Sequence, residues 1–242
     1  MNKIIIAIYK KIKNNFLHFR VRIFKFYSLI KFPNLWVFIL FGIMPAFEHL
    51  KVLRNIKNIN SLIDCGSNKG QFAILIFSVF RIKSYLSFDP IVVPVEANKF
   101  LRSKKVDTMH KKVALSLDDN QAKFYITERE DSSSLKKTIS HSSKFCPDVI
   151  HKKTISVQVK KLDDFEQLIK KLPRPKALKV DVQGSEYELL IGARSVLEEI
   201  DYLFVEISYK SLYLDTQPNH KIFTLLEKLK FKKISSYNFF LR

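Results

Sequence analysis

The 242-residue chain is poor in cysteine, glycine and proline, with two, five and eight of them respectively. Cys65 and Cys146 form neither a paired disulfide framework nor a metal-binding spacing, which favours a reducing cytoplasmic setting. The small number of glycines and prolines argues against a low-complexity chain, and the sequence contains no internal repeat. An ordinary globular protein is therefore expected.

A long apolar run is also missing. The most apolar stretch, Leu35 to Phe41, continues to Phe47 only across Gly42 and Pro45, whereas a bilayer span needs roughly 20 residues. Residues 1–30 do not resemble a secretory signal, because Lys and Arg interrupt every apolar segment. With 47% hydrophobic residues, the chain is nevertheless long enough for one α/β domain with a full core and an appendage.

Positive charge is concentrated at the start of the chain. The net charge is +19, and residues 1–60 contribute +10 of it, through eight Lys and three Arg against one Glu. From Ile5 to Ile30, apolar residues recur every three or four positions, which predicts a basic amphipathic helix with an aromatic-rich face. Such a helix fits an acidic membrane surface; the alternative is a helix packed on the rest of the protein with a solvated basic rim. We therefore expect a basic helical extension over 1–47 and a second domain over 48–242.

The second domain is organised around a strand, a glycine turn and a helix. An apolar strand over Ser61–Cys65 leads through Gly66 and Gly70 into an apolar-periodic helix from Gln71 to about Phe80. The glycines leave room for a ligand against the main chain, and amides at the helix start attract polar groups. The G-x-x-x-G spacing differs from those of dinucleotide-binding and phosphate-binding loops, which disfavours a pyrophosphate ligand and an NAD-dependent dehydrogenase.

Two carboxylates end the first two strands of this domain. Asp64 precedes the glycine turn, and an acidic group followed by a short turn suits a ligand with a cation and hydroxyls, such as S-adenosylmethionine. Asp89 follows the strand Ser84–Phe88, 25 residues later, which is the length of one β-α-β unit. From the strand tip it can accept hydrogen bonds from both ribose hydroxyls. A plain strand-turn-helix connection and an ordinary strand-ending turn are the alternatives.

The rest of the chain alternates further strands and helices. The polar residues 129–148 form either a mobile loop or a lid near the ligand. The other expected helices are Val92–Lys104, Leu162–Leu172 and His220–Lys230, and the other expected strands are Val106–Met109, Ala122–Thr127, Thr154–Val159, Ala177–Val182, Tyr202–Val205 and Phe231–Tyr237. This order predicts an α/β fold with a mostly parallel sheet flanked by helices.

A second dense polar stretch surrounds the strand Ala177–Val182. Lys179, Asp181 and Glu186 lie within eight residues at its carboxyl end, and Glu206 ends the next apolar strand. Ionisable groups at such positions are unfavourable unless they line a cleft or pair with one another. Open α/β sheets bind ligands at this edge, so these residues are candidates for a functional site.

Together these motifs resemble the FkbM family of S-adenosylmethionine-dependent methyltransferases. The resemblance covers about residues 43–238 in the family's order, and its specificity lies in the combination of motifs. The segments that carry it are Asp64–Phe72, Phe88–Pro90, Asp131–Leu135, Leu162–Phe165, Lys179–Glu186 and Val205–Ser208, with further matches at Glu48–His49, Leu212–Tyr213, Gln217 and Tyr237–Asn238.

The resemblance implies a Rossmann-like methyltransferase fold and transfer of a methyl group to a hydroxyl of a saccharide, glycolipid or secondary metabolite. The cofactor would be S-adenosylmethionine, and the acceptor a small molecule or glycan. Carried over by position, the residues expected to bind the cofactor are Asp64, Gly66, Ser67, Asn68, Gly70, Asp89 and Ala114.

Two features depart from the family pattern. Its members usually carry Glu where Asp89 stands, so a water or a closer ribose would have to compensate for the shorter side chain. Similar proteins also continue past the pair Tyr237-Asn238 into a terminal strand, whereas residues 239–242 follow here. The last edge strand of the sheet is therefore expected to be missing. The consequence would be a destabilised or inactive protein, or another element that covers the edge.

Methyl transfer to a hydroxyl requires an aligned acceptor and a base. The candidate bases are Asp181 and Glu206, with Lys179 and Glu186 orienting or neutralising and His49 as an outside candidate. A cofactor contact for Asp181 and a structural ion pair of Lys179 with Glu186 are the alternatives. No cluster of His or Cys indicates a required metal, although Asp181 and Glu206 could hold Mg²⁺ if they lie close enough.

Two other functions compete with this interpretation. A nucleic-acid methyltransferase would explain the basic charge, but it would need basic residues interleaved with aromatics along the cleft, and the signature of base amino-methylation is missing. A non-catalytic, membrane-associated protein that retains the fold is the second alternative, supported by the expected gap in the sheet. We expect a cytoplasmic O-methyltransferase, peripheral at the inner membrane surface if the N-terminal helix binds acidic lipid.

Overall fold

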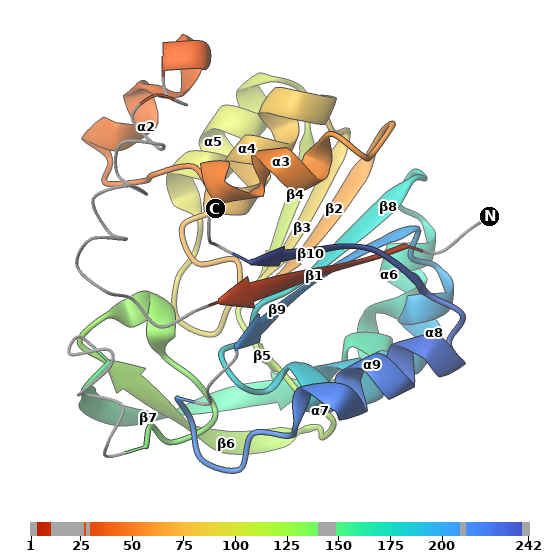
Figure 1. The fold of residues 1–242 in the computed structure, drawn as a ribbon. Coiled ribbons are helices and arrows are strands. Elements are labelled where there is room, and N and C mark those ends of the chain that lie inside the picture. Colours follow the sequence, from red (N-terminus) through yellow and green to blue (C-terminus); the bar gives the residue numbers. More distant parts are fainter. Residues whose placement is uncertain (1–3, 11–26, 28–29, 140–148, 209–211, 239–242) are drawn as a thin grey trace.

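A seven-stranded parallel sheet forms the centre of the fold (Figure 1). The computed structural model describes residues 4–10, 27, 30–139, 149–208 and 212–238. The strand order is β10-β1-β9-β8-β2-β3-β4, and every neighbouring pair runs parallel. The strands are β1 (Ile4–Lys10), β2 (Ser61–Cys65), β3 (Ser84–Phe88), β4 (Asp107–Lys111), β8 (Lys176–Val180), β9 (Tyr202–Ser208) and β10 (Lys232–Asn238). The expected Rossmann-like α/β architecture is confirmed.

Helices cover both faces of this sheet (Figure 1). One face carries α3 (Leu50–Leu53), α4 (Gln71–Phe80) and α5 (Val95–Ser103), with α2 (Val37–Leu40) beyond them. The other carries α6 (Glu166–Lys170), α7 (Glu186–Ile191), α8 (Arg194–Glu198) and α9 (Asn219–Lys228). Short 3₁₀ helices span Pro33–Leu35, Phe47–His49, Glu130–Ser132 and Leu162–Phe165. A smaller sheet, in the order β5-β7-β6, consists of β5 (Ala114–Leu115), β7 (His151–Lys160) and β6 (Asn120–Thr127).

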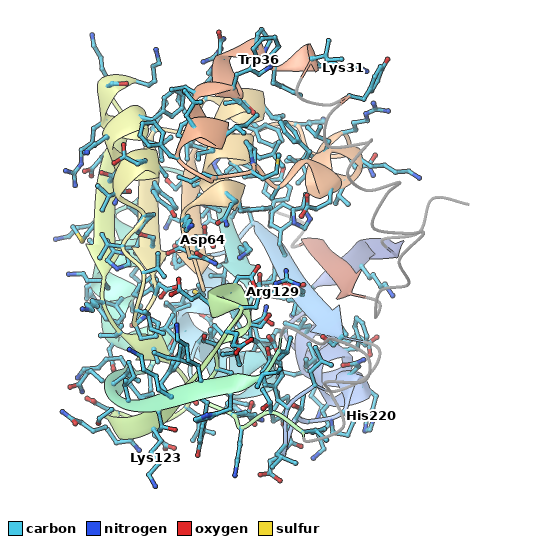
Figure 2. All side chains as sticks on the ribbon, turned by 90° about the vertical axis from the view of Figure 1, so that its left-hand side faces the viewer. Lys31, Trp36, Asp64, Lys123, Arg129 and His220 are labelled. Atoms are coloured by element: carbon cyan, nitrogen blue, oxygen red, sulfur yellow. The ribbon has the colours of Figure 1, made fainter. Side chains whose placement is uncertain are left out.

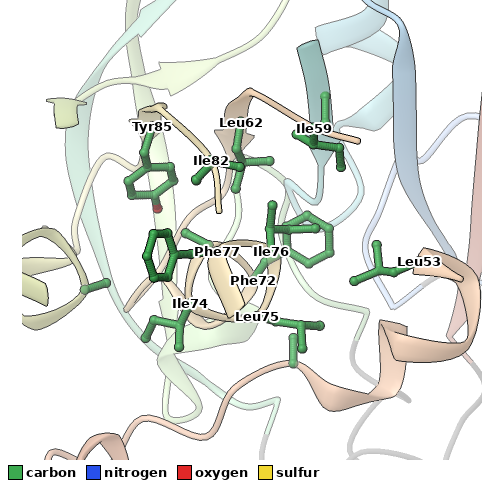
Figure 3. Packing of buried hydrophobic residues seen from close by; sticks show 14 of the residues in the cluster. Leu53, Ile59, Leu62, Phe72, Ile74, Leu75, Ile76, Phe77, Ile82 and Tyr85 are labelled. Carbon is green, nitrogen blue, oxygen red and sulfur yellow. The ribbon is translucent and has the colours of Figure 1, made fainter. Parts of the chain in front are cut away.

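The central strands are buried along their whole length. Every residue of β2, β3 and β8 is buried, as expected for parallel strands with helices on both faces. The buried side chains of α4 lie on both sides of the helix: Ile76 points to the sheet, and Ile74 and Leu75 point to the opposite side (Figure 3). The helix predicted from Gln71 to Phe80 is confirmed, and it is a core element on nearly every side.

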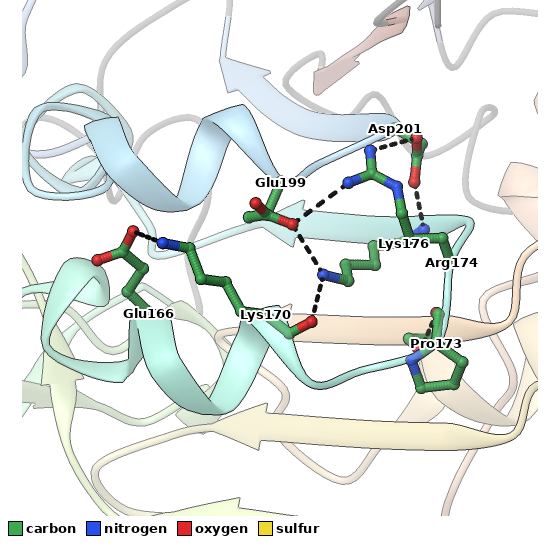
Figure 4. Close-up of polar contacts among 8 residues, drawn as sticks. Glu166, Lys170, Pro173, Arg174, Lys176, Glu199 and Asp201 are labelled. Atoms are coloured by element: carbon green, nitrogen blue, oxygen red, sulfur yellow. Dashed lines mark hydrogen bonds and ion pairs between the residues drawn. The ribbon is translucent and has the colours of Figure 1, made fainter.

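A charged network holds the amino end of β8 (Figure 4). The ammonium of Lys176, whose side chain is 1% exposed, donates to the Lys170 carbonyl at 3.1 Å and pairs with Glu199 at 3.1 Å. Arg174 bridges Glu199 at 3.2 Å and Asp201 at 2.7 Å. Because the buried ammonium is both paired and hydrogen-bonded, no uncompensated charge is left at this end of the sheet, opposite its carboxyl edge.

The helix predicted to begin at Ile5 is wrong over residues 5–10, because residues 4–10 form β1. This strand lies between β9 and β10 and is parallel to both, so both of its edges are paired. The division of the chain at residue 47 therefore does not hold for residues 4–10, which belong to the central sheet. The rest of the predicted amphipathic helix, 11–26 and 28–29, lies outside the described residues.

The strand expected to be missing from the sheet has a substitute. In the structure β9 is paired on both sides, with β8 and with β1, and β10 follows β1 as the edge strand. Of the two expected consequences, an element that covers the edge is the one observed. The gap that supported a non-catalytic protein is thus absent from the described part of the sheet.

The other expected elements are present with shifted boundaries. Helix α5 begins at Val95 rather than Val92, because Pro94 occupies its N-cap position. The predicted helix 162–172 divides into a 3₁₀ turn and the short helix α6.

Candidate active site

Adjacent parallel strands bring the predicted site residues to one edge of the sheet. β9, β8, β2 and β3 are neighbours, and their carboxyl ends therefore lie side by side. Asp64 lies in β2, Asp89 follows β3, Asp181 follows β8 and Glu206 lies near the end of β9. Residues far apart in the sequence thus lie along one edge of the sheet. Asp64 is fully buried (Figure 2), whereas Asp89, Asp181 and Glu206 are half-buried.

The glycine turn after β2 is fastened to the end of β3. The N–H groups of Gly66 and Ser67 donate to the Phe88 carbonyl at 2.9 and 3.1 Å, and the Asn68 N–H donates to Asp89 Oδ2 at 3.0 Å. These three amides are therefore engaged within the protein rather than open to a ligand.

Gly66 has no room for a side chain. Its φ is +77°, and an added Cβ would lie 1.9 Å from the Asp181 carbonyl oxygen. Gly42 also has a positive φ, +65°, but no heavy atom lies within 4 Å of an added Cβ there.

We expect Gly66→Ala to lower the unfolding midpoint by about 10 °C or more. Gly42→Ala adds only backbone strain of about 1–2 kcal/mol and should lower the midpoint by a few degrees. Thermal unfolding of both variants checks this. Equal midpoints would contradict the close approach of the turn to Asp181.

Asp89 shapes the turn and keeps capacity for a ligand. Its Oδ2 accepts the Asn68 N–H at 3.0 Å, while Oδ1 accepts the N–H groups of Ile91 and Val92 at 2.9 and 2.8 Å. A carboxylate oxygen can accept two hydrogen bonds, so Oδ2 can also accept one from a hydroxyl. The predicted ribose contact is compatible with this geometry and stays a prediction.

His110, near the carboxyl end of β4, was missed by the sequence reasoning. Its Nδ1 lies 3.0 Å from Ser87 Oγ, and its Nε2 is buried with no hydrogen-bond partner among the described residues. Burial lowers the pKa of the imidazole, and the Asp89 carboxylate, together with the ring's contact to the Asp89 backbone, opposes this. A buried ring nitrogen without a partner suits hydrogen bonding to a heterocyclic base. Its position at the end of the strand beside β3 is the signal that could have identified it.

Three of the residues predicted to bind the cofactor are buried. The exposed fractions of Asp64, Ser67 and Ala114 are 0%, 3% and 4%. Ala114 lies in β5 and packs in the core of the smaller sheet with Phe124. Asp64 Oδ2 lies 3.4 Å from the Tyr85 hydroxyl. Direct contacts of these side chains with a cofactor stay predictions.

Lys179 links the carboxylates of β2 and of the turn after β8. Its Nζ lies 3.3 Å from Asp64 Oδ1 and 3.2 Å from Asp181 Oδ2, and donates to the Gly66 carbonyl at 3.2 Å. Burial lowers the pKa of the ammonium, but Asp181, Asp64 and Glu206 outweigh burial and raise that pKa above its usual value. Burial raises the pKa of the Asp64 carboxyl, and Lys179 opposes this. Lys179 therefore stays charged, which excludes it as a base and suits a neutralising role.

A cavity of about 230 Å³ lies beyond the ends of β8 and β9. Glu186 and Glu206 both line it, together with Gln217 and Asn219. Both oxygens of the Glu186 carboxylate accept the Gly184 N–H at 3.0 Å. Burial raises the pKa of Glu186 to about 7, although these hydrogen bonds lower it. A carboxyl group with this pKa can exchange a proton near neutral pH.

The beginning of the segment 129–148, expected to be either a mobile loop or a lid, is hydrogen-bonded to the turn between β8 and α7. Ser134 Oγ donates to the Gln183 carbonyl at 2.7 Å, and the Tyr213 hydroxyl lies 2.7 Å from the Ser132 carbonyl and 3.0 Å from Gln183 Oε1. The segment therefore lies over the edge of the site. Residues 140–148 of this segment fall outside the described residues.

His49 packs against the core helix α4. Its ring contacts Phe72 edge-on at 5.3 Å, and Phe72 contacts Phe204 in the same way at 5.2 Å. These contacts give His49 a structural position, and its role as a base stays an untested alternative.

Comparison with protein-family models gives a match for most of the chain. Residues 64–233 match the model described as the methyltransferase FkbM domain. Neither the curated proteins nor the solved structures gave a match. The matched range begins at Asp64 and ends within β10, so it includes the carboxyl edge described above.

Proposed function

Because the chain belongs to the FkbM methyltransferase family, we propose that it transfers a methyl group from S-adenosylmethionine to a hydroxyl of a saccharide, glycolipid or secondary metabolite. The observation that carries this proposal is the cavity of about 230 Å³ lined by Glu186 and Glu206. Carboxylates accept hydrogen bonds from hydroxyls, and the side-chain amides of Gln217 and Asn219 can donate and accept them. A ligand rich in hydroxyls therefore suits this lining.

The surroundings of Asp89 fit the adenosine part of this cofactor. The remaining acceptor site of Asp89 Oδ2 suits a ribose hydroxyl, and the buried Nε2 of His110, without a partner in the described part of the chain, suits a ring. S-adenosylmethionine supplies a methyl group on a sulfonium, which is a strong methyl donor. We propose that Asp89 and His110 hydrogen-bond the cofactor. Because the N–H groups of Gly66, Ser67 and Asn68 are already engaged within the protein, we propose that the other residues only form the walls of its site; these are Asp64, Gly66, Ser67, Asn68, Gly70 and Ala114.

We propose Glu186 as the base that accepts the proton of the acceptor hydroxyl. It lines the cavity, and burial brings its pKa to about 7, close to the pH at which a carboxylate base must work. Asp181 is less suited, because Lys179 pairs with it at 3.2 Å. Glu206 remains the second candidate, and Lys179 neutralises the carboxylates around it.

Cofactor binding is the first test of this function. Calorimetric titration of the full chain should show binding of S-adenosylmethionine and S-adenosylhomocysteine but not of NAD. His110→Ala and Asp89→Asn should each weaken binding about tenfold, because each removes or weakens one hydrogen bond to the ligand. Asp107→Asn, at the exposed opposite end of β4, is the matched control and should leave the Kd unchanged. Absence of binding in a sample that unfolds cooperatively would contradict the proposal and favour the non-catalytic alternative.

A small molecule or glycan is the proposed acceptor, rather than nucleic acid. Two carboxylates at the cavity would repel a phosphate backbone, which is recognised by cations. Label transfer from S-adenosylmethionine to methyl glycosides, but not to DNA or RNA oligonucleotides, is the expected result. A cytoplasmic location is part of the proposal, supported by the buried free thiol of Cys65.

A further inference from the structure

Residues 27–41 carry a group of large apolar side chains that are exposed to solvent. Half of the fourteen exposed large apolar side chains among the described residues lie in this short segment, and the exposed fraction reaches 85% at Leu40. We call this surface the apolar cap; its members are Tyr27, Ile30, Trp36, Val37, Ile39, Leu40 and Phe41. Figure 2 shows Trp36 at one end of the molecule, away from Asp64. Such a concentration of apolar surface indicates an interaction site.

The cap is fixed to the domain by its inward side chains. Leu35, Phe38 and Ile43 are 1%, 2% and 4% exposed, and the Phe38 ring contacts Phe100 of α5 edge-on at 4.9 Å. The inward residues anchor the segment in the core. The outward residues are therefore held in place without contributing their area to folding.

Two lysines lie beside the cap. Lys31 Nζ lies 5.0 Å from the centre of the Tyr27 ring, and Lys104 Nζ lies 5.8 Å from the centre of the Phe100 ring, on which Phe38 packs. Along the sequence, no acidic residue precedes Glu48. The apolar surface is thus bordered by exposed basic side chains and carries no acidic residue of its own.

We infer that the apolar cap inserts into the interface of a membrane with acidic headgroups, which Lys31 and Lys104 contact. Trp36 and Phe41 are aromatic side chains of the kind enriched at this interface, and the cations complement the lipid charge. No described helix has the length and hydrophobicity to cross a bilayer, so the insertion is interfacial. The cap takes the place of the predicted helical anchor, whose residues 4–10 lie in the sheet, and the inference does not depend on methyl transfer.

A second copy of the chain is a poorer partner for this surface. In a two-fold symmetric dimer the same patch faces itself, so Lys31 and Lys104 of one copy would approach those of the other. Anionic lipid removes this repulsion and also accepts the apolar side chains.

Trp36 provides a direct measurement, because it is the one tryptophan of the sequence. The full chain is titrated with vesicles of phosphatidylcholine and phosphatidylglycerol, and with phosphatidylcholine alone. We expect a blue shift of Trp36 emission with the acidic vesicles, quenching by lipids brominated on the acyl chain, and binding weakened at least about tenfold without phosphatidylglycerol. Unchanged emission and no quenching at saturating lipid would overturn the inference.

Matched variants separate the cap from the general basic charge. Leu40→Asp should weaken vesicle binding at least about tenfold, whereas Ile150→Asp, at a residue 45% exposed next to β7, should not. Both positions are exposed, so the fold is expected to persist, which the unfolding midpoint checks. Equal vesicle binding by the two variants would overturn the inference. So would a lipid-free dimer, seen by sedimentation, that Leu40→Asp dissociates, because the cap would then bind a second copy.

Discussion

Replacement of Ala7 by proline is expected to abolish the cooperative unfolding of the protein or to lower its midpoint by about 10 °C. Ala7 lies in the middle of β1, opposite Val205 of β9 on one side and Ser236 of β10 on the other. Proline has no N–H for the ladder, and its ring is excluded from the interior of a sheet. A decrease of about 3–5 kcal/mol in the free energy of unfolding corresponds to a decrease of roughly 10 °C in the unfolding midpoint for a chain of this size. Differential scanning calorimetry measures it.

Ala7→Ser is the control, because serine keeps the N–H group with almost the same volume. Its midpoint should stay within a few degrees of that of the unchanged protein. If Ala7→Pro unfolds at the same temperature as Ala7→Ser, β1 is not an interior strand, and the sheet is left without a strand between β9 and β10.

Glu186→Gln is expected to reduce methyl transfer to methyl glycosides about 10²–10⁴-fold, because the amide cannot accept the hydroxyl proton. The rate of the unchanged protein should rise with pH through a midpoint near the pKa of about 7 that burial gives Glu186. The binding of S-adenosylhomocysteine should change little, since the residue faces the acceptor cavity. Radiolabel transfer measured across pH 5 to 9 checks the rate and its midpoint.

The same substitution has an independent effect on stability. Glu186 has a pKa of about 7 in the folded protein against 4.5 for the ordinary group. Below about pH 4.5 Glu186 is protonated in both the folded and the unfolded state. Between about pH 4.5 and about pH 7 the unfolded state loses this proton first. The free energy of unfolding therefore falls by up to about 3 kcal/mol as the pH rises through this range. Glutamine does not titrate. Glu186→Gln should therefore raise the unfolding midpoint at pH 8 more than at pH 4.5.

Glu188→Gln is the matched control on the same helix. Glu188 pairs with Lys136 at 2.8 Å and is not part of the cavity lining. The rate of methyl transfer by Glu188→Gln should therefore stay within about threefold of that of the unchanged protein. If Glu186→Gln is stabilised at pH 8 but keeps its rate, Glu186 is a buried structural acid. Glu206→Gln is then the next variant to lose activity.

The strand and the helix on either side of the glycine turn could be predicted, because the spacing of apolar residues in each segment fits the element that the segment forms. Ser61–Cys65 and Gln71–Phe80 are apolar runs with clear breaks, and the structure has them at the predicted bounds. β1 could not be predicted in the same way. Its isoleucines also fit the three- and four-residue spacing of a helix, and the partners that select the strand are distant residues, 202–208 and 232–238.

The placement of the candidate residues at one edge of the sheet could be predicted, but the protonation state of their side chains could not. Asp64, Asp89, Asp181 and Glu206 were expected at strand ends, and the parallel order places them at one edge. From the sequence, Glu186 was predicted to orient or neutralise other groups. Its raised pKa could not be predicted, because the burial that causes it depends on packing between α7 and segments distant in the chain. His110 was missed for a related reason. Only the pairing of β4 with β3 places its buried nitrogen at the edge of the sheet that holds the other candidate residues.

The interior position of β1 also has a consequence for synthesis on the ribosome. Residues 4–10 are translated roughly 200 residues before their partners in β9, and at about 5–20 residues per second this interval lasts roughly 10–40 s. β2, β3 and β4 are available earlier and can pair with one another during that time. During that interval the isoleucine-rich segment 4–10 has neither of its pairing partners, so its apolar surface stays open to non-native contacts until the last strands emerge.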